Sequence, residues 1–166
     1  MILPFWGLGI FLEKSRKRKK ILIFGLGYVG LPLAVEFSKK YQTKYFTFSD
    51  EAVSPHSLND VSEEITKRGL NIKSLALLKF EKVMDEQLFQ RMRQAGFIFL
   101  MYGLESANDR VLSLIDKGTD QKTERDVLEK SHKAGIWNHS FMFFGFPTET
   151  RDEAQDTINF LMKNLH

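Results

Sequence analysis

The chain of 166 residues is 43% hydrophobic and 27% charged, values typical of one soluble globular domain. It has no cysteine, which excludes disulfides, thiolate metal sites, cysteine nucleophiles and an iron–sulfur cluster held by this sequence, and which suits a cytoplasmic protein. Residues 14–20 hold six of the 24 basic side chains, whereas the rest is nearly neutral and is not a nucleic-acid surface.

Residues 1–19 form an apolar and then basic leader. Its apolar part covers residues 1–12, which is too short for a bilayer span of about 20 residues. The basic residues follow the apolar ones, which is the reverse of a signal peptide. We expect a poorly ordered leader; contact of residues 1–20 with a membrane surface is the less favoured alternative.

Apolar strand-like runs alternate with amphipathic helix-like runs over residues 20–166, which we interpret as one domain. The expected strands cover residues 21–24, 44–48, 72–78, 97–102 and 140–144. The expected helices cover residues 31–40, 58–68, 88–95, 107–117 and 122–134, with a last helix after Thr150, where T-R-D-E spells a capping box. Glycines at 69, 96 and 135 each end a helix shortly before an apolar strand, as a left-handed cap does.

This alternation predicts an α/β fold of about five βα units with a mainly parallel sheet. The sheet would be either part of a TIM-like barrel or an open Rossmann-like sheet. Both architectures bind ligands at the carboxyl ends of their strands, so the residues that follow each strand are the candidates for a site. A partial barrel also leaves strand edges exposed, which favours self-association.

The loop after the first predicted strand is rich in glycine. Gly25, Gly27 and Gly30 spell G-x-G-x-x-G, and Asp50 stands where an acid would accept the ribose hydroxyls of a dinucleotide. The stretch KKILIFGLGYVGLPLAVEFSKKY resembles the amino terminus of the nucleotide-sugar dehydrogenases, which oxidise UDP-sugars with NAD. The resemblance implies NAD binding by the three glycines. That family's catalytic cysteine has no counterpart in this chain.

The later strand ends carry a different set of motifs in order. These are DE at 50–51, GLES at 103–106, RVL at 110–112, KG at 117–118, AG at 134–135 and GFPTET at 145–150. Together they resemble the radical SAM superfamily, especially members coupled to a cobalamin-binding domain, over residues 42–164. We therefore interpret residues 20–41 as a dehydrogenase-like unit joined to a radical SAM-like partial barrel.

The radical SAM resemblance implies a set of residues for S-adenosylmethionine. Asp50 and Glu51 would lie near its amino group, and Glu105 and Ser106 near its ribose. The stretch from Gly145 to Glu149 would border the adenine. Each residue also has an ordinary structural interpretation: Ser106 is a good N-cap, Glu105 can pair with a lysine, and the capping box explains Thr150.

One departure from the family decides the functional hypothesis. Radical SAM enzymes hold a 4Fe–4S cluster on three cysteines in the loop after the first barrel strand, where this chain has its glycine loop and no cysteine. We therefore expect an incomplete relative without a cluster or radical catalysis of its own. It would retain binding of S-adenosylmethionine or another small nucleotide-like ligand. An NAD-binding module and a non-enzymatic fusion fragment are the alternatives, and no metal site is expected.

Overall fold

The computed structural model describes residues 10–14, 19–23, 30–48 and 53–164. Its strands are β1 (Ile10–Lys14), β2 (Lys19–Ile23), β3 (Tyr45–Phe48), β4 (Lys73–Leu78), β5 (Phe97–Glu105) and β6 (Trp137–Met142). Its helices are α1 (Gly30–Tyr41), α2 (Pro55–Lys67), α3 (Glu86–Gln94), α4 (Asp109–Leu114), α5 (Gln121–Lys133) and α6 (Arg151–Lys163). The predicted α/β fold with five βα units is confirmed.

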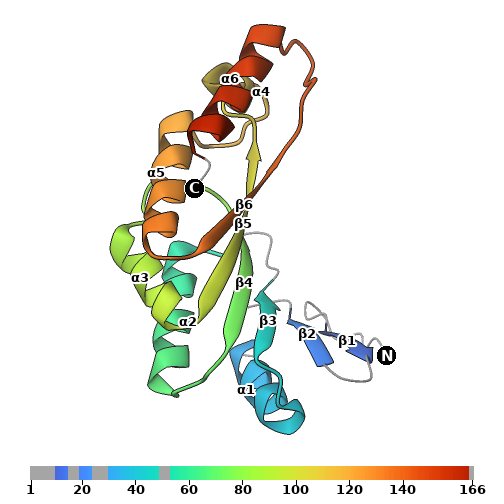
Figure 1. The fold of residues 1–166 in the computed structure, drawn as a ribbon, viewed down its shortest axis with the longest axis vertical. Helices are drawn as coiled ribbons and strands as arrows, with labels where there is room; N and C mark the ends of the chain where they lie inside the picture. Colours follow the sequence, from blue (N-terminus) through green and yellow to red (C-terminus); the bar gives the residue numbers. More distant parts are fainter. Residues whose placement is uncertain (1–9, 15–18, 24–29, 49–52, 165–166) are drawn as a thin grey trace.

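All six strands belong to one sheet whose spatial order is the order of the chain, β1-β2-β3-β4-β5-β6. Strands β2 to β6 pair in parallel, and β1 pairs with β2 in antiparallel orientation. Because right-handed crossovers that always advance in one direction put their helices on one face, this order is that of a barrel wall. Helices α2, α3 and α5 indeed lie along the same face of the sheet (Figure 1). Of the two predicted sheets, the described part therefore matches the partial barrel.

Part of the predicted leader lies in the sheet, while its expected poor order stays a prediction. Residues 10–14 form β1, which pairs with β2 so that Leu12 lies opposite Ile21. This pairing satisfies the backbone N–H and C=O groups along that side of β2. The apolar content of the leader alone did not indicate a strand.

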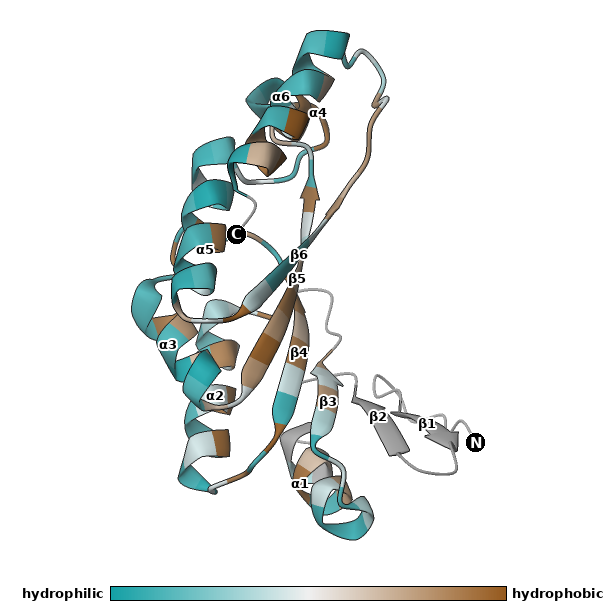
Figure 2. Cartoon of the chain, in the orientation of Figure 1, coloured by the Kyte–Doolittle hydropathy of each residue, from teal (hydrophilic) through white to brown (hydrophobic). Residues whose placement is uncertain are grey.

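The helix-covered face of the sheet forms the core. Apolar side chains of β3, β4 and β5 pack there against those of α2 and α3, and Figure 2 shows a hydrophobic stretch along β5. The fully buried members include Phe46, Phe48, Leu58, Ile65, Phe89, Met92 and Leu100. Burial of each such side chain stabilises the fold by roughly 1.5–3 kcal/mol.

The opposite face of the sheet is open among the described residues. Side chains alternate between the two faces of a strand, so the outward positions of β6 bring Trp137, His139 and Phe141 to this face. Trp137 is 76% exposed, and the His139 ring lies between Phe99 and Phe141, with centroids 6.1 and 4.8 Å away. In a closed barrel this face would be interior. The expectation that exposed edges favour self-association stays a prediction.

Two of the element boundaries that differ from the sequence-based prediction have an identifiable cause. Strand β6 begins at Trp137 rather than at residue 140, because Asn138 is held on the helix-facing side by hydrogen bonds with Ser131 and with the carbonyl of Leu128. The prediction that Ser106 caps the next helix is wrong, since α4 begins later and its N-cap is Asn108.

The helix-ending glycines are confirmed. Gly69, Gly96 and Gly135 have φ values of +61°, +98° and +78°, the left-handed conformation that glycine adopts without strain. Gly96 has a second constraint, since a Cβ there would lie 2.1 Å from the carbonyl oxygen of Ile72. At Gly69 no atom lies within 4 Å of such a Cβ.

We predict that Gly96→Ala lowers the free energy of unfolding by about 3 kcal/mol or more, because it adds a backbone clash to the strain of a positive φ. Gly69→Ala is the matched control and should cost only about 1–2 kcal/mol, the conformational term alone. Urea unfolding followed by circular dichroism measures both. Equal losses in the two variants would contradict the steric role of Gly96.

Candidate functional site

The carboxyl ends of β5 and β6 lie side by side and carry two of the predicted motifs. The backbone N–H of Phe143 donates to the carbonyl of Glu105 at 3.1 Å, which joins the GLES end of β5 to the chain leading into GFPTET. The pairing of these strands is irregular between Gly103 and Glu105. Glu105 itself has a φ of +61°, which is uncommon for a residue with a side chain.

Glu105 forms an ion pair at this edge. Its Oε1 lies 2.9 Å from Nζ of Lys117, which comes from the loop after α4. The two side chains are 28% and 20% exposed, so water reaches the pair. A Cβ on Gly103 would lie 2.6 Å from Glu105 Oε1 and 2.8 Å from Lys117 Nζ. The pair therefore rests directly on the backbone of Gly103, and the predicted pairing of Glu105 with a lysine is confirmed.

A second carboxyl lies nearby and was missed in the sequence. Glu124, in the first turn of α5, is fully buried and neither of its oxygens has a hydrogen-bond partner among the described residues. Burial raises its pKa to about 9, repulsion by Asp109, Asp120 and Glu105 adds to the rise, and attraction by Lys117 opposes it. Glu124 is therefore protonated at neutral pH.

The sequence does carry a signal for Glu124. This residue shares the buried side of α5 with Val127, Leu128 and Ser131, at spacings of three, four and seven residues. An acid in register with an apolar helix face points to a buried carboxyl.

Ser106 lies at the predicted edge but faces the packed side. It is fully buried, and its hydroxyl lies 3.2 Å from Oγ1 of Thr157 on α6. The same Thr157 oxygen accepts from the backbone N–H of Ala107 at 2.9 Å. Ser106 thus joins the end of β5 to α6, and its assignment to a ribose contact stays a prediction.

The loop from Gly145 to Glu149 is closed by its own last residue. The Gly145 N–H donates to Oε2 of Glu149 at 2.5 Å, and the Glu149 N–H donates to the carbonyl of Phe146 at 2.8 Å. Gly145 and Thr148 have positive φ values of +82° and +73°. The carboxylate of Glu149 therefore shapes this loop, which leaves Gly145 exposed at the edge.

Arg110 joins this loop to two helices. From α4, its guanidinium donates to the carbonyl of Thr148 at 2.7 Å and makes a two-pronged contact with Glu153 on α6. Hydrogen bonding from Arg110, and then from the Thr150 backbone, lowers the pKa of Glu153 to about 2. The predicted capping box at Thr150 is confirmed, with Glu153 as its second member.

Several predicted ligand residues fall outside the described ranges. These are Gly25, Gly27, Asp50 and Glu51. Gly30 is the first residue of α1. Of the predicted set, the structure thus brings together Glu105, Ser106 and the Gly145–Glu149 loop.

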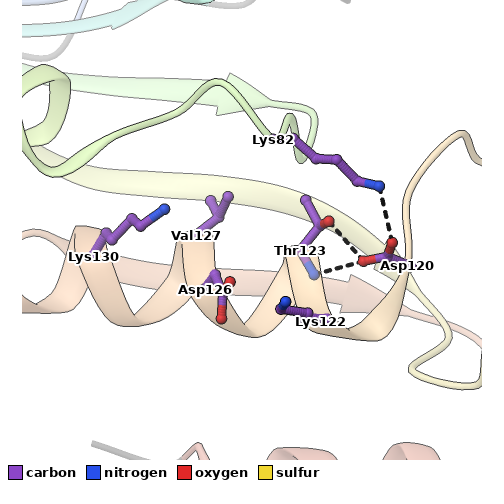
Figure 3. Close-up of a pocket in the computed structure, with 7 residues that line it drawn as sticks. All are labelled: Lys82, Asp120, Lys122, Thr123, Asp126, Val127 and Lys130. Carbon is purple, nitrogen blue, oxygen red and sulfur yellow. Dashed lines mark hydrogen bonds and ion pairs between the residues drawn. The ribbon is translucent and has the colours of Figure 1, made fainter.

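A cavity of about 330 Å³ lies between α5 and the loop after β4, lined by Lys82, Asp120, Lys122, Thr123, Asp126, Val127 and Lys130 (Figure 3). Asp120 accepts hydrogen bonds from the hydroxyl and N–H of Thr123 at 2.6 and 2.7 Å, and Lys82 pairs with it at 3.1 Å. These contacts lower the pKa of Asp120 to about 2. The contacts of Asp120 are thus satisfied within the protein, and none of the predicted ligand residues lines the cavity.

Two absences hold for the described ranges alone. No three histidine, aspartate or glutamate side chains there gather closely enough to hold a metal ion. No helix in the same ranges has the length and apolar character needed to cross a membrane.

The comparisons with known proteins establish the family. The model of the radical SAM superfamily matches residues 31–161, so this chain belongs to that superfamily. The match extends over residues 31–41, which the glycine motif predicts to be part of a dehydrogenase-like unit, and it gives that prediction no support. The predicted radical SAM resemblance is confirmed at the level of the superfamily, over residues 42–161 of the predicted range.

Two curated relatives illustrate the range of the similarity. An uncharacterized methyltransferase of Pyrococcus horikoshii is 29% identical over 126 residues, which cover 75% of this chain and 27% of the relative. An anaerobic magnesium-protoporphyrin IX monomethyl ester cyclase of Rubrivivax gelatinosus is 24% identical over 127 residues, or 72% of this chain and 22% of the relative. The chain thus spans about a quarter of the length of these relatives.

Solved structures share the fold. The methyltransferase TsrM from Kitasatospora setae, solved with cobalamin and a 4Fe–4S cluster bound, superposes with a TM-score of 0.71 at 15% identity, covering 84% of this chain and 27% of TsrM. The cobalamin-dependent enzyme OxsB, with aqua-cobalamin bound, gives a TM-score of 0.68 at 18% identity, covering 80% of this chain and 21% of OxsB. At these identities the likeness shows the fold alone.

We predict that Thr157→Val destabilises the joint between β5 and α6. The substitution keeps the shape but leaves the Ala107 N–H and the Ser106 hydroxyl without their shared partner, which should cost about 2–3 kcal/mol in unfolding free energy. Thr157→Ser retains the oxygen and should cost about 1 kcal/mol. Chemical denaturation of both variants separates the hydrogen bonds from the lost methyl group, and a larger loss in the serine variant would contradict this role.

We predict that Glu124 makes stability fall as pH rises. The carboxyl ionises near its ordinary value of 4.5 in the unfolded chain and near 9 in the folded chain, so the folded state holds an extra proton between these values. Its contribution to the unfolding free energy then falls by up to about 1.4 kcal/mol per pH unit in this range. Urea unfolding of Glu124→Gln between pH 6 and 8 should lack this slope, whereas the exposed control Glu63→Gln should keep it. Identical slopes in all three proteins would show that Glu124 is not buried as described.

Proposed function

We propose that this chain forms the nucleoside-binding part of a radical SAM barrel and binds S-adenosylmethionine at the carboxyl ends of β5 and β6. The observation that carries the proposal is the partly exposed carboxylate of Glu105, which stands at the end of β5 beside the Gly145–Glu149 loop. Carboxylates are strong acceptors for pairs of sugar hydroxyls. Only Oε1 of Glu105 accepts a hydrogen bond from the described residues, which leaves its second oxygen for a ligand.

The residues of this chain fit the nucleoside but not the cluster. Glu105 would accept the ribose hydroxyls, and the exposed backbone at Gly145 would border the adenine. Bound S-adenosylmethionine offers a methylsulfonium and an adenosyl group for chemistry. A 4Fe–4S cluster requires cysteine thiolates in this family, and the sequence has none, so we assign no radical step to residues of this chain.

Two alternatives remain to be separated from this proposal. A dinucleotide would use Gly25, Gly27, Gly30 and Asp50. The observation that favours it is that α1 begins at Gly30, the last glycine of the motif, because a helix N-terminus favours a phosphate. A non-enzymatic fusion fragment would bind neither ligand. Because the chain spans about a quarter of its relatives, the reactions named for those proteins are not transferred to it.

We predict that isothermal titration calorimetry detects S-adenosylmethionine binding and that Glu105→Gln weakens it about 10-fold to 100-fold. That is the range expected for the loss of a charge-assisted hydrogen bond worth about 1.5–3 kcal/mol. Glu63→Gln, the same change at an exposed position on α2, should leave the affinity unaltered.

The same titration with NAD distinguishes the alternatives. Binding of NAD without S-adenosylmethionine would overturn the proposal in favour of the dinucleotide module, and Gly27→Val should then abolish it. Binding of neither compound would favour the non-enzymatic fragment.

A further inference from the structure

We propose that Lys117 is a positioning residue for Glu105 and that this ion pair requires a residue without a side chain at position 103, which is Gly103. The loop after α4 would then fix the orientation of the ligand-binding carboxylate through the contact of Lys117 with Oε1 of Glu105. This inference rests on the proposed function and deepens it, because it names residues that determine how well Glu105 meets a ribose.

The backbone at Glu105 does not by itself fix the side chain. A non-glycine residue at a φ of +61° is strained, and such a conformation persists only where the surroundings hold it. The side-chain carboxylate of Glu105 lies close to the backbone of Gly103, two residues earlier in the chain. The contact that holds it is Lys117 Nζ at 2.9 Å.

The position of Lys117 is itself fixed by the turn that follows α4. Its backbone N–H donates to the carbonyl of Leu112 at 3.1 Å, and the residues on either side, Asp116 and Gly118, have φ values of +52° and +72°. The turn brings the ammonium group inward, so that the Lys117 side chain is only 20% exposed. A lysine on an open surface would keep its rotamer freedom, whereas this one is committed to a single partner.

Gly103 makes this arrangement possible. A methyl group at position 103 would lie inside contact distance of both charged atoms, at 2.6 and 2.8 Å. Gly103→Ala would therefore displace the Glu105 carboxylate without removing any charge. The position of the Glu105 carboxylate thus explains why the GLES motif has a glycine here. A turn does not explain it, since Gly103 is not among the glycines with a positive φ.

The surroundings of Lys117 favour pairing with Glu105. Lys117 is one of four charged groups that act on Glu124, and the other three are Asp109, Asp120 and Glu105. Asp120 is already paired with Lys82, and Asp109 accepts from the N–H of Gln121 at 2.8 Å. Glu124 is buried, and its oxygens have no hydrogen-bond partner within the described part of the chain. Glu105 is therefore the carboxylate that Lys117 contacts.

A double-mutant cycle in S-adenosylmethionine affinity tests the inference. Lys117→Met should weaken binding about 10-fold in the natural background. It should cause no further loss in the Glu105→Gln background, because its effect acts through Glu105. Gly103→Ala should behave in the same way, and Lys117→Arg should restore the affinity to within about threefold. Lys122→Met, at a nearby exposed lysine, is the matched control and should have no effect.

The outcomes separate this inference from the proposed function. Equal losses from Lys117→Met with and without Glu105, or no rescue by arginine, would overturn the positioning role while binding itself stands. If the natural protein binds no S-adenosylmethionine, the proposed function fails. The same variants are then compared by their thermal unfolding midpoints. Non-additive shifts for Lys117 and Glu105 would support the pair as a positioned unit, and additive shifts would overturn it.

Discussion

Burial of one face of a parallel sheet is the constraint on which the rest of this structure depends. Strands β3, β4 and β5 present Phe46, Phe48 and Leu100 to the helices, and every crossover must return over that face to keep them covered. The same winding brings all carboxyl ends of the parallel strands to one edge. The position of the candidate site is therefore a consequence of how the core is covered, before any residue of the site is considered.

Two of the motif residues that mark the family in this chain connect separate elements. Arg110 connects α4 to the Gly145–Glu149 loop and to Glu153, and Ser106 connects the end of β5 to Thr157 on α6. These contacts fix the segments that surround the carboxyl ends of β5 and β6, where a small number of groups remain accessible to a ligand. Selection for rigid segments and selection for ligand contact would favour the same short motifs, which explains why a structural and a functional interpretation of each residue compete so closely.

The sequence was sufficient where local chemistry determines the outcome. Helix-ending glycines, the Thr150 capping box and the alternation of strands and helices depend on nearest neighbours, and the structure has them as predicted. It was insufficient where distant partners decide. Asn108 caps α4 while the Ser106 hydroxyl contacts Thr157, 51 residues away, and Asn138 lies in a strand where α5 satisfies its side chain. The buried state of Glu124 likewise depends on contacts that its own helix does not reveal.

The open face of the sheet carries a fluorescent side chain whose emission reports on what contacts this face. Trp137 is one of only two tryptophans in the chain and is 76% exposed on that face. Its indole emission depends on contact with water, so anything that covers the face shifts the spectrum toward the blue. Occupancy of this side of the sheet, by another polypeptide or by a small molecule, is thus readable in dilute solution without a label.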